Sequence, residues 1–396
     1  MKCKITNKQI EPFMSFGKMP IANGFLHKDK FNKEFFFEME VGFSPDLSLF
    51  QLNDHPKPKM MFNENYPFFT GSSQQMKIHF NNYANWAKKY HPSKIKNVVE
   101  IGSNDGTFLK NFNTGDYNIL GFEPSSNVAE RALKDGINTV SKFFDKNSVK
   151  DQKKFIGNTD LICAANVICH VPDLSDLIQS VDMMLSKNGV FIFEEPYLGS
   201  MFEKVSYDQI YDEHIFIFSV SSVCKIFKLF NMELIDVLPQ STHGGSMRYV
   251  IARKNVHKIS NNVSVILKNE KLKNLDNISS CIEFKNKCEL SKIKTRENLL
   301  NFKKNNLKIA GYAATSKSTT ILNYCNINNN IIDYICDTTP EKIGKYSPGT
   351  HIPIVDMSHF KNFTPDVAYL FAWNHKDEIF KKEKNFKGEW FSHVAL

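Results

Sequence analysis

The chain has 396 residues, of which 42% are hydrophobic and 23% charged, so the composition excludes a disordered or fibrous protein. Its length suffices for two or three domains of roughly 100–200 residues each. The formal net charge is +8, but 12 Lys or Arg and only 5 Asp or Glu lie between positions 256 and 308, so one stretch supplies most of the excess. This stretch lacks the interleaved aromatic residues of a nucleic-acid-binding module, so we interpret it as a lysine-rich solvated helix and expect no nucleic-acid partner.

The first residues lack the apolar core of a signal peptide, and no run approaches the ~18 apolar residues of a membrane span. We therefore expect a cytoplasmic protein without a membrane partner. Eight cysteines are scattered along the chain without a Cys-x-x-Cys pair, which predicts neither a disulfide framework nor a metal cage.

Residues 1–71 are rich in phenylalanine and turns and show no helical period, which predicts a small β-rich module. A helix follows from Ser72 to about Lys89. Short apolar runs then alternate with stretches that can form helices, which predicts a mainly parallel sheet. These runs lie at 98–101, 119–122, 161–165 and 190–193. Two more strands, at 232–237 and 247–252, are expected to pair antiparallel at one edge and complete an α/β domain at 72–255.

The basic stretch has a broken helical pattern of apolar residues, which predicts a connector of one or two helices at 256–305. Strands expected at 307–312, 331–337 and 367–372, with a helix at 315–324, predict a second, Rossmann-like α/β domain at 306–396. The fold class expected for the whole chain is therefore α/β, with a small β-rich module at the start.

A glycine turn follows the first strand of the larger α/β domain. The strand ends near Glu100, the turn contains Gly102 and Gly106, and Glu123 follows the next strand. This arrangement can hold an adenosine, with Glu123 accepting hydrogen bonds from the ribose hydroxyls. Pro124 beside it and Asn166 after a later strand are expected to line the same site.

The charge of this turn decides which adenosine cofactor it suits. A dinucleotide needs a glycine in the middle of the turn, where this chain has Asn104 and the anionic Asp105. A carboxylate there repels phosphate but attracts the sulfonium and ammonium groups of S-adenosylmethionine (SAM). We therefore predict SAM as the cofactor; a dinucleotide or a purely structural turn are the less favoured alternatives.

The series of motifs along nearly the whole chain resembles the sugar-nucleotide C-methyltransferase family. The matching stretches are GKMPIAN at 17–23, FTGSS at 69–73, EIGSNDG at 100–106, NVICHVPD at 166–173, YDEH at 211–214, HGGSMR at 243–248, GYAATSK at 311–317, KYSPGT at 345–350 and AWNH at 372–375. The resemblance implies a zinc-binding N-terminal module, a class I methyltransferase domain at 72–255 and a C-terminal Rossmann-like domain that helps to hold a nucleotide sugar.

The chain departs from this family at the zinc module, which uses two Cys-x-x-Cys pairs. Only Cys3 is present here, and Thr6, Ser44 and Leu47 stand at the other positions. A single thiolate cannot build a tetrahedral structural site, so we expect no zinc and a module held together by aromatic packing.

Transfer of a methyl group to a sugar carbon requires a carbanion equivalent, which a ketone supplies when a base removes the proton beside it. We predict His214 as that base, because an imidazole near its ordinary pKa of about 6.5 accepts a proton at neutral pH. Glu213 is expected to orient this imidazole, and Tyr211 to bind the ketone or enolate oxygen. A helix start with a surface histidine is the structural alternative. The resemblance implies that His170 is a second active-site histidine. The structural alternative is a histidine that only packs within its loop.

Further residues are expected to hold the substrate. Tyr66 or Phe69 matches a family tyrosine that reaches over the sugar, although Phe69 has no hydroxyl to offer. His243 and Arg248 are expected to bind the diphosphate. Ser316 and Lys317, at the start of a helix, are expected to bind it as well, and Tyr346 is expected to fold over the same ligand. The alternative for each of these motifs is a turn with a purely structural role.

The predicted function is methyl transfer from SAM to a carbon adjacent to the keto group of a 4-keto-deoxy nucleotide sugar. The alternatives are O- or N-methylation of a nucleotide-linked sugar or glycan precursor, and a non-catalytic nucleotide-sugar-binding protein. The sequence leaves open the nucleotide base, the sugar, the methylated ring atom and the oligomeric state.

Overall fold

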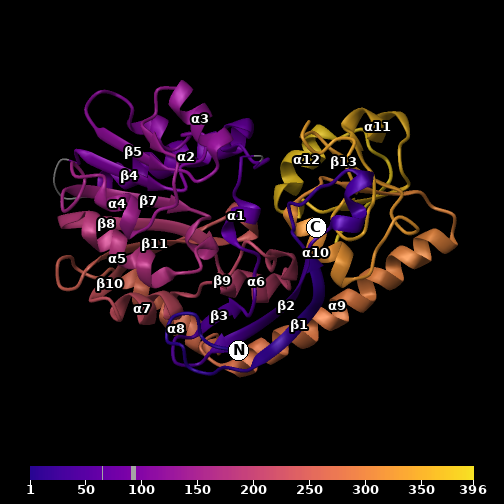
Figure 1. Cartoon of the computed structure of the whole chain (residues 1–396). Helices are drawn as coiled ribbons and strands as arrows, with labels where there is room; N and C mark the ends of the chain where they lie inside the picture. Colours follow the sequence, from indigo (N-terminus) through magenta and orange to yellow (C-terminus); the bar gives the residue numbers. More distant parts are fainter. Residues whose placement is uncertain (65, 91–94) are drawn as a thin grey trace.

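The computed structural model describes residues 1–64, 66–90 and 95–396 and contains three sheets. Figure 1 shows the largest sheet on one side, the C-terminal sheet on the other, and the N-terminal strands β1 and β2 running beneath and between them. Residues far apart in the sequence therefore meet at the junction of these three parts.

The largest sheet has seven strands in the order β10-β11-β8-β7-β4-β5-β6. Strands β6, β5, β4, β7 and β8 are parallel, whereas β11 runs antiparallel to both of its neighbours, β8 and β10. This reversed strand near one edge confirms the expected antiparallel pair and gives the class I methyltransferase arrangement. The strands are β4 (Asn97–Ile101), β5 (Asn118–Phe122), β6 (Thr139–Val140), β7 (Thr159–Ala165), β8 (Leu185–Pro196), β10 (Met232–Gln240) and β11 (Ser246–Arg253).

Several helices pack on this sheet because burial removes their apolar side chains from water. The longest, α2 (Gln74–Tyr90), buries Phe80, Tyr83, Ala84 and Ala87. The others are α3 (Ser126–Lys134), α4 (Lys146–Lys150), α5 (Leu174–Met184), α6 (Leu198–Lys204) and α7 (Val220–Lys228), with short 3-10 helices η3 (Leu109–Phe112), η4 (Ile168–His170), η5 (Tyr207–Gln209) and η6 (Thr242–Gly244). The helix expected after the glycine turn is only η3, because turn residues at 113–115 follow one turn after the buried Phe108.

The N-terminal residues form an antiparallel sheet of β1 (Pro12–Pro20), β2 (Phe36–Ser44) and β3 (Leu49–Leu52), to which β9 (Phe216–Ile217) adds from the larger domain. Five of its phenylalanines are buried in a cluster shared with the C-terminal domain, so this module does not have a separate core; they are Phe13, Phe16, Phe37, Phe43 and Phe50. Short helical segments complete this part of the chain: η1 (Lys28–Lys33), α1 (Pro58–Met61) and η2 (Thr70–Ser72).

The C-terminal sheet is fully parallel, in the order β14-β13-β12-β15-β16, which is a Rossmann-like arrangement. Its elements are β12 (Ile309–Tyr312), α10 (Ser316–Tyr324), β13 (Tyr334–Asp337), β14 (Ile354–Asp356), α11 (Met357–Asn362), β15 (Val367–Leu370), η7 (Trp373–His375), α12 (Lys376–Lys382) and β16 (Glu389–Phe391).

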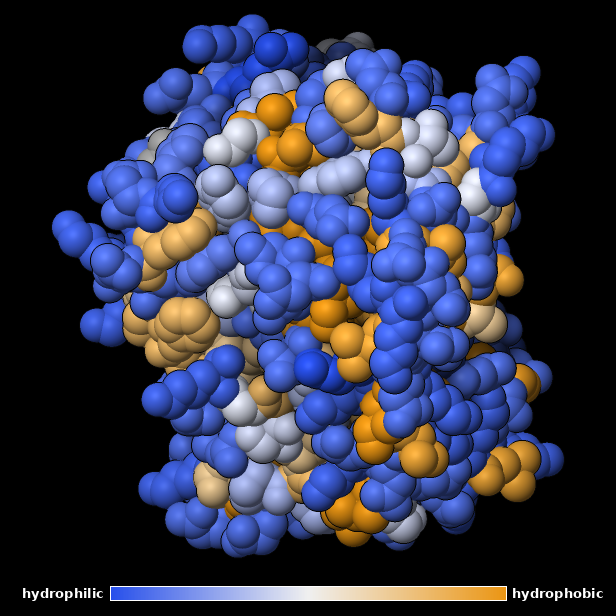
Figure 2. Space-filling view, turned by 90° about the vertical axis from the view of Figure 1, so that its right-hand side faces the viewer, coloured by the Kyte–Doolittle hydropathy of each residue, from blue (hydrophilic) through white to orange (hydrophobic). Residues whose placement is uncertain are grey.

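The basic stretch forms two helices, α8 (Asn261–Leu272) and the 27-residue α9 (Ile278–Lys304), as predicted. Figure 1 shows α9 running along the outside of the molecule from the N-terminal strands to the C-terminal domain. Viewed from the side of the C-terminal domain, the surface is mainly hydrophilic and hydrophobic side chains appear in small groups (Figure 2). Among the described residues, no helix combines the length and the apolar character needed to cross a membrane.

A buried carboxylate attaches the connector to the larger domain. Glu270 on α8 is fully buried and accepts hydrogen bonds from the backbone N–H groups of Val220 (2.6 Å) and Ser221 (2.8 Å) at the start of α7. The hydroxyls of Ser221 (2.6 Å) and Tyr197 (2.9 Å) also donate to it. The charge therefore satisfies the free amides of a helix N-terminus.

We predict that Glu270→Gln destabilises the protein by about 1–3 kcal/mol. The NH₂ group of the new glutamine replaces one carboxylate oxygen, so the N–H and O–H donors that pointed at that oxygen lose their acceptor. This loss lowers the thermal unfolding midpoint by about 2–10 °C, measured by circular dichroism. The control is Glu283→Gln, at a side chain that is 67% exposed, which should shift the midpoint by little. Equal midpoints for both variants would contradict the role of Glu270.

Candidate active site

A cavity of about 1350 Å³ lies where the three parts of the chain meet. It is larger than the roughly 300–1,000 Å³ of a typical small-molecule site, so it has room for two ligands side by side. Residues 1–71 contribute Asn23 and residues 57–59, 62 and 66–70, and the C-terminal domain contributes residues 315–317, 337–342, 372, 374 and 375. The larger domain lines the rest, at the carboxyl ends of its parallel strands.

One end of the cavity is formed by the loop after β4. Gly102 has a φ of +66°, and a Cβ atom there would lie 2.3 Å from Val167 Cγ2, so only glycine fits. Asn104 also lines this end, and its left-handed φ of 48° turns the loop over the strand end. Gly106 (φ +75°) completes the turn but is not among the lining residues.

Glu123 and Glu100 both line this end of the cavity. Glu123 accepts the backbone N–H of Asn104 (3.1 Å) and of Ser125 (2.8 Å), which holds its carboxylate beside the loop, with Pro124 lining the cavity next to it. Burial raises the pKa of both glutamates. The buried Glu100 Oε2 has no hydrogen-bond partner among the described residues, so a cationic ligand fits beside it.

Asp105 does not line the cavity, which corrects the prediction that its charge faces the cofactor. Its Oδ2 accepts the backbone N–H of Gly71 (2.8 Å), and its Oδ1 accepts the hydroxyl of Thr107 (2.6 Å). Asn104 Oδ1 likewise accepts the N–H of Thr70 (2.8 Å). These side chains hold the segment before α2 against the loop, because a short polar side chain in a turn bonds readily to nearby backbone.

His214 is buried among protein groups that define its protonation. Its Nδ1 lies 2.7 Å from the Gln209 carbonyl oxygen, which can only accept, so Nδ1 carries the proton. Its Nε2 therefore has a free electron pair, which accepts the hydroxyl of Tyr211 at 2.9 Å. Burial and the neighbouring His170 hold the pKa of His214 well below its ordinary value, so it is neutral at pH 7. Our expectation of an ordinary pKa was wrong, because it assumed an imidazole in water.

Glu213 lines the cavity but makes no hydrogen bond to His214 among the described contacts, so the Gln209 carbonyl and not Glu213 orients the imidazole. Instead, Glu213 Oε1 accepts the side-chain N–H of Asn23 at 2.7 Å. Burial raises the pKa of Glu213 to about 7, since a carboxylate here has lost its water.

His170 stacks on His214, with ring centroids 5.3 Å apart, and on Phe62 at 5.7 Å. Burial lowers the pKa of His170 to about 3, and its buried Nε2 has no partner among the described residues. The two predicted histidines are therefore brought together as neutral rings, with one nitrogen free to meet a ligand.

Tyr66 and Phe69 both line the cavity, in the segment before α2. Of the two, only Tyr66 has a hydroxyl group. Burial and the nearby Glu213 and Tyr211 raise the pKa of this phenol well above the usual value. Ser316, at the start of α10, forms a hydrogen bond with the Tyr211 side chain. The C-terminal domain thus reaches the catalytic cluster.

Three more of the predicted residues line the cavity: Asn166, His243 and Lys317. Asn166, with a left-handed φ of 56°, donates through Nδ2 to His243 Nε2 at 3.0 Å. Lys317 is buried, which lowers its pKa, and its Nζ contacts Asn374 at 3.4 Å. A lysine ammonium with so few partners suits a bound anion.

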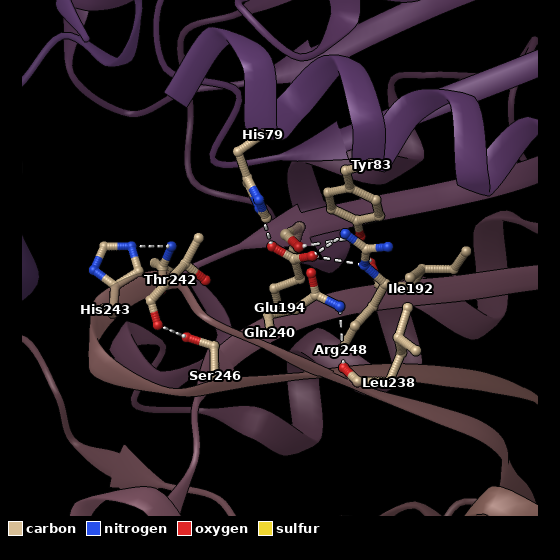
Figure 3. Close-up of polar contacts among 12 residues, drawn as sticks. His79, Tyr83, Ile192, Glu194, Leu238, Gln240, Thr242, His243, Ser246 and Arg248 are labelled. Carbon is tan, nitrogen blue, oxygen red and sulfur yellow. Dashed lines mark hydrogen bonds and ion pairs between the residues drawn. The ribbon is translucent and has the colours of Figure 1, made fainter. Parts of the chain in front are cut away.

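Arg248 is not placed to bind a diphosphate. It is 4% exposed, its Nε donates to Glu194 at 2.6 Å, and its guanidinium lies 4.1 Å from the ring centroid of Tyr83 and 4.6 Å from that of Trp86. His79 bonds to the same carboxylate at 2.6 Å (Figure 3). Arg248 lies on β11, an inner strand of the sheet, and its guanidinium packs against rings of α2. The buried ion pair with Glu194 occupies this guanidinium, so it is not available for a diphosphate.

Tyr346 also lies outside the cavity. Its backbone forms an antiparallel bridge with Leu26, and its ring packs edge-on against Phe31 at 5.1 Å. The loop that we expected to cover the ligand therefore joins the C-terminal domain to the N-terminal module.

The sequence did not reveal three residues of the site. Gln209 acts through its backbone carbonyl, which no motif marks, and Lys342 lies on a loop without a recognisable pattern. Asn23 ends the matched stretch 17–23, so a signal existed for it, but no chemical role followed from that signal.

Two places bear on metal binding. At the N-terminal module, burial alone would raise the pKa of the Cys3 thiol, but hydrogen bonds with Thr6 and Ser44 outweigh this and hold the pKa below its usual value. Leu47 is part of the adjacent core, so this place offers one thiol and does not fit a tetrahedral zinc site. At the cavity, one donor atom each of Cys169, His170 and His214 lie within 4.8 Å of one another, a group that could hold a metal ion.

Three family models match the chain in succession. They are a putative zinc binding domain at residues 3–62, a methyltransferase domain at 77–237 and a C-methyltransferase C-terminal domain at 241–394. The C-methyltransferase NovU of Streptomyces niveus is 27% identical over 94% of this chain and 89% of its own length.

Solved structures with similar folds include a putative methyltransferase in complex with the Trm112 activator from Haloferax volcanii. It is 14% identical, covers 47% of this chain and 95% of its own, and has a TM-score of 0.38. The magnesium protoporphyrin IX methyltransferase of Synechocystis with bound SAM is 12% identical, covers 45% of this chain and 79% of its own, and has a TM-score of 0.34.

The name of the N-terminal family model and the donor group at Cys169 do not fit our expectation of a protein without zinc, which is corrected to this extent. The expected fold class and the expected methyltransferase activity agree with the comparisons. The seven-stranded sheet, the acidic loop after β4 and the succession of matched domains show that the chain is a SAM-dependent methyltransferase whose C-terminal part matches a C-methyltransferase domain model.

Proposed function

We propose that this enzyme transfers the methyl group of SAM to a carbon next to the keto group of a 4-keto-deoxy nucleotide sugar, by way of an enolate. The observation that carries the proposal is the buried, neutral His214, which lines a cavity large enough for both ligands and whose Nε2 accepts the hydroxyl of Tyr211. The relative NovU is named a C-methyltransferase, which supports transfer to carbon.

His214 suits removal of a proton from a carbon acid. The Gln209 carbonyl fixes its tautomer, and burial keeps the ring neutral, so Nε2 is ready to accept the proton. The C–H electron pair moves into the ketone to form an enolate, which then attacks the methyl carbon as the S–CH₃ bond breaks. Tyr211, released from Nε2 when the substrate binds, is placed to donate to the enolate oxygen.

The charges along the cavity support a cationic donor beside an anionic acceptor. Glu100 and Glu123 line the end near the β4 loop, whereas the end formed by the C-terminal domain has the cations Lys317 and Lys342 together with Asp337 and Glu341. Ser316 and Lys317 at the start of α10 suit the diphosphate of a nucleotide sugar. All eight cysteines are free thiols, which fits the reducing cytoplasm that we propose as the location.

We predict that His214→Gln abolishes exchange of the α-proton when the enzyme and a 4-keto nucleotide sugar are incubated in deuterated water. The expected loss is about 10²–10⁴-fold, because the base is gone. SAM affinity, measured by calorimetry, should remain. The control is His257→Gln, at a surface histidine that bonds to the Asn188 carbonyl. Methyl transfer without any exchange in the wild-type enzyme would favour O- or N-methylation, and absence of SAM binding would favour a non-catalytic protein.

We predict that Glu123→Ala weakens SAM binding about 10- to 100-fold, the loss expected for hydrogen bonds to a charged group. Glu130→Ala, an exposed change on neighbouring α3, should leave the affinity unchanged. Calorimetric titration with SAM provides the measurement, and thermal unfolding checks that the variant is folded. Equal affinities for the two variants would place the adenosyl group elsewhere.

The pH dependence of exchange distinguishes His214 from Glu213 as the base. A base must be unprotonated, so the rate falls as the pH drops below its pKa. Because Glu213 has a pKa of about 7 and His214 one well below 6.5, Glu213→Gln should lower but not abolish exchange and leave an acid limb only below pH 6.5. Complete loss of exchange in this variant at every pH would make Glu213 the base.

A further inference from the structure

The segment that follows β1 is held between the two α/β domains. The backbone N–H of Ala22 donates to Asp212 Oδ1 at 3.0 Å, and the carbonyl of Ala22 accepts the Thr319 hydroxyl at 2.8 Å. These bonds link the N-terminal module to both domains at once. They place the next residue, Asn23, at the cavity wall.

The side chain of Asn23 makes a separate contact. Its Nδ2 donates to Glu213 Oε1 at 2.7 Å, in a place where Glu213 is 3% exposed. Because this N–H donor occupies Oε1, Oε2 is the oxygen whose lone pairs are both open. Oε2 accepts no hydrogen bond among the described residues, so it is the oxygen left for a ligand in the cavity.

The other polar side chains near Glu213 interact with it through charge and do not form a hydrogen bond with its carboxyl as Asn23 does. Asp212, Tyr66, Tyr211 and Cys169 are the acidic groups that interact electrostatically with it, and Lys342 is the nearby cation. None of these five forms a hydrogen bond with the Glu213 carboxyl among the described contacts. The amide of Asn23 is therefore the one neutral donor seen to fix its orientation within the described chain.

We propose that Asn23 is a positioning residue: it turns the carboxyl of Glu213 so that Oε2 faces the substrate, and the N-terminal module thereby completes the active site. The inference rests on the proposed function, because it assigns Asn23 a part in the same proton transfer. The backbone of Ala22 already attaches the segment, so the side chain of Asn23 is not needed for that attachment.

The test compares the full-length enzyme with Asn23→Ala and Asn23→Asp, using the rate of α-proton exchange into a 4-keto nucleotide sugar. Asn23→Ala should lower the exchange rate about 10- to 100-fold. SAM affinity should be unchanged. Asn23→Asp should lose at least as much, because it sets a second acceptor against Oε1.

A double-mutant cycle with Glu213→Ala separates positioning from general damage. If Asn23 acts through Glu213, adding Asn23→Ala to Glu213→Ala should cause no further loss. If Asn23 only supports packing or touches the substrate directly, the double variant should lose the same factor again, which would overturn the proposal.

The matched control is Asn53→Ala. Asn53 donates to the Glu40 carboxylate at 3.0 Å in the same module, and neither residue lines the cavity, so the same kind of bond is removed without touching the site. Its exchange rate should equal that of the wild type. Wild-type rates in Asn23→Ala would refute the positioning role alone. No exchange in the wild-type enzyme would instead refute the proposed function, and the inference with it.

Discussion

Burial of ionisable side chains at the junction of three domains is the constraint on which this enzyme depends. Strand β1, helix α6 and helix α10 contribute to one continuous hydrophobic cluster, so the cavity walls from different parts of the chain are held in a common core. Water is largely excluded from the polar groups between them. A histidine there stays neutral and a glutamic acid holds its proton more tightly, and these are the states that proton transfer at neutral pH requires.

The same junction divides charge along the cavity. The loop after β4 brings carboxylates to one end, and the C-terminal domain brings lysines to the other. Among the described residues, Glu100 Oε2 has no hydrogen-bond partner, and Lys317 Nζ forms one hydrogen bond, with Asn374 at 3.4 Å. Two ligands of opposite charge can thus bind side by side, each compensating a buried group that would otherwise be costly.

Several polar residues of the matched motifs stabilise the scaffold instead of touching a ligand. Asp105 fastens the segment before α2, Arg248 neutralises Glu194 beneath that helix, and Tyr346 joins two domains. Each was a reasonable ligand contact from its residue type. Their side chains nevertheless point away from the cavity, since strand alternation and turn geometry decide the direction in which a side chain leaves the backbone.

The order of strands and helices, the glycine turn with its acidic residues, and the cluster of Tyr211, Glu213 and His214 could be predicted from the residues alone, because periodicity, turn residues and short motifs are local properties of the chain. Which oxygen or nitrogen of each group is free could be seen only in the folded molecule. The tautomer of His214 depends on the Gln209 carbonyl, and the orientation of Glu213 depends on Asn23, which is 190 positions away. Burial and long-range hydrogen bonds arise from packing between distant segments, so no local pattern contains them.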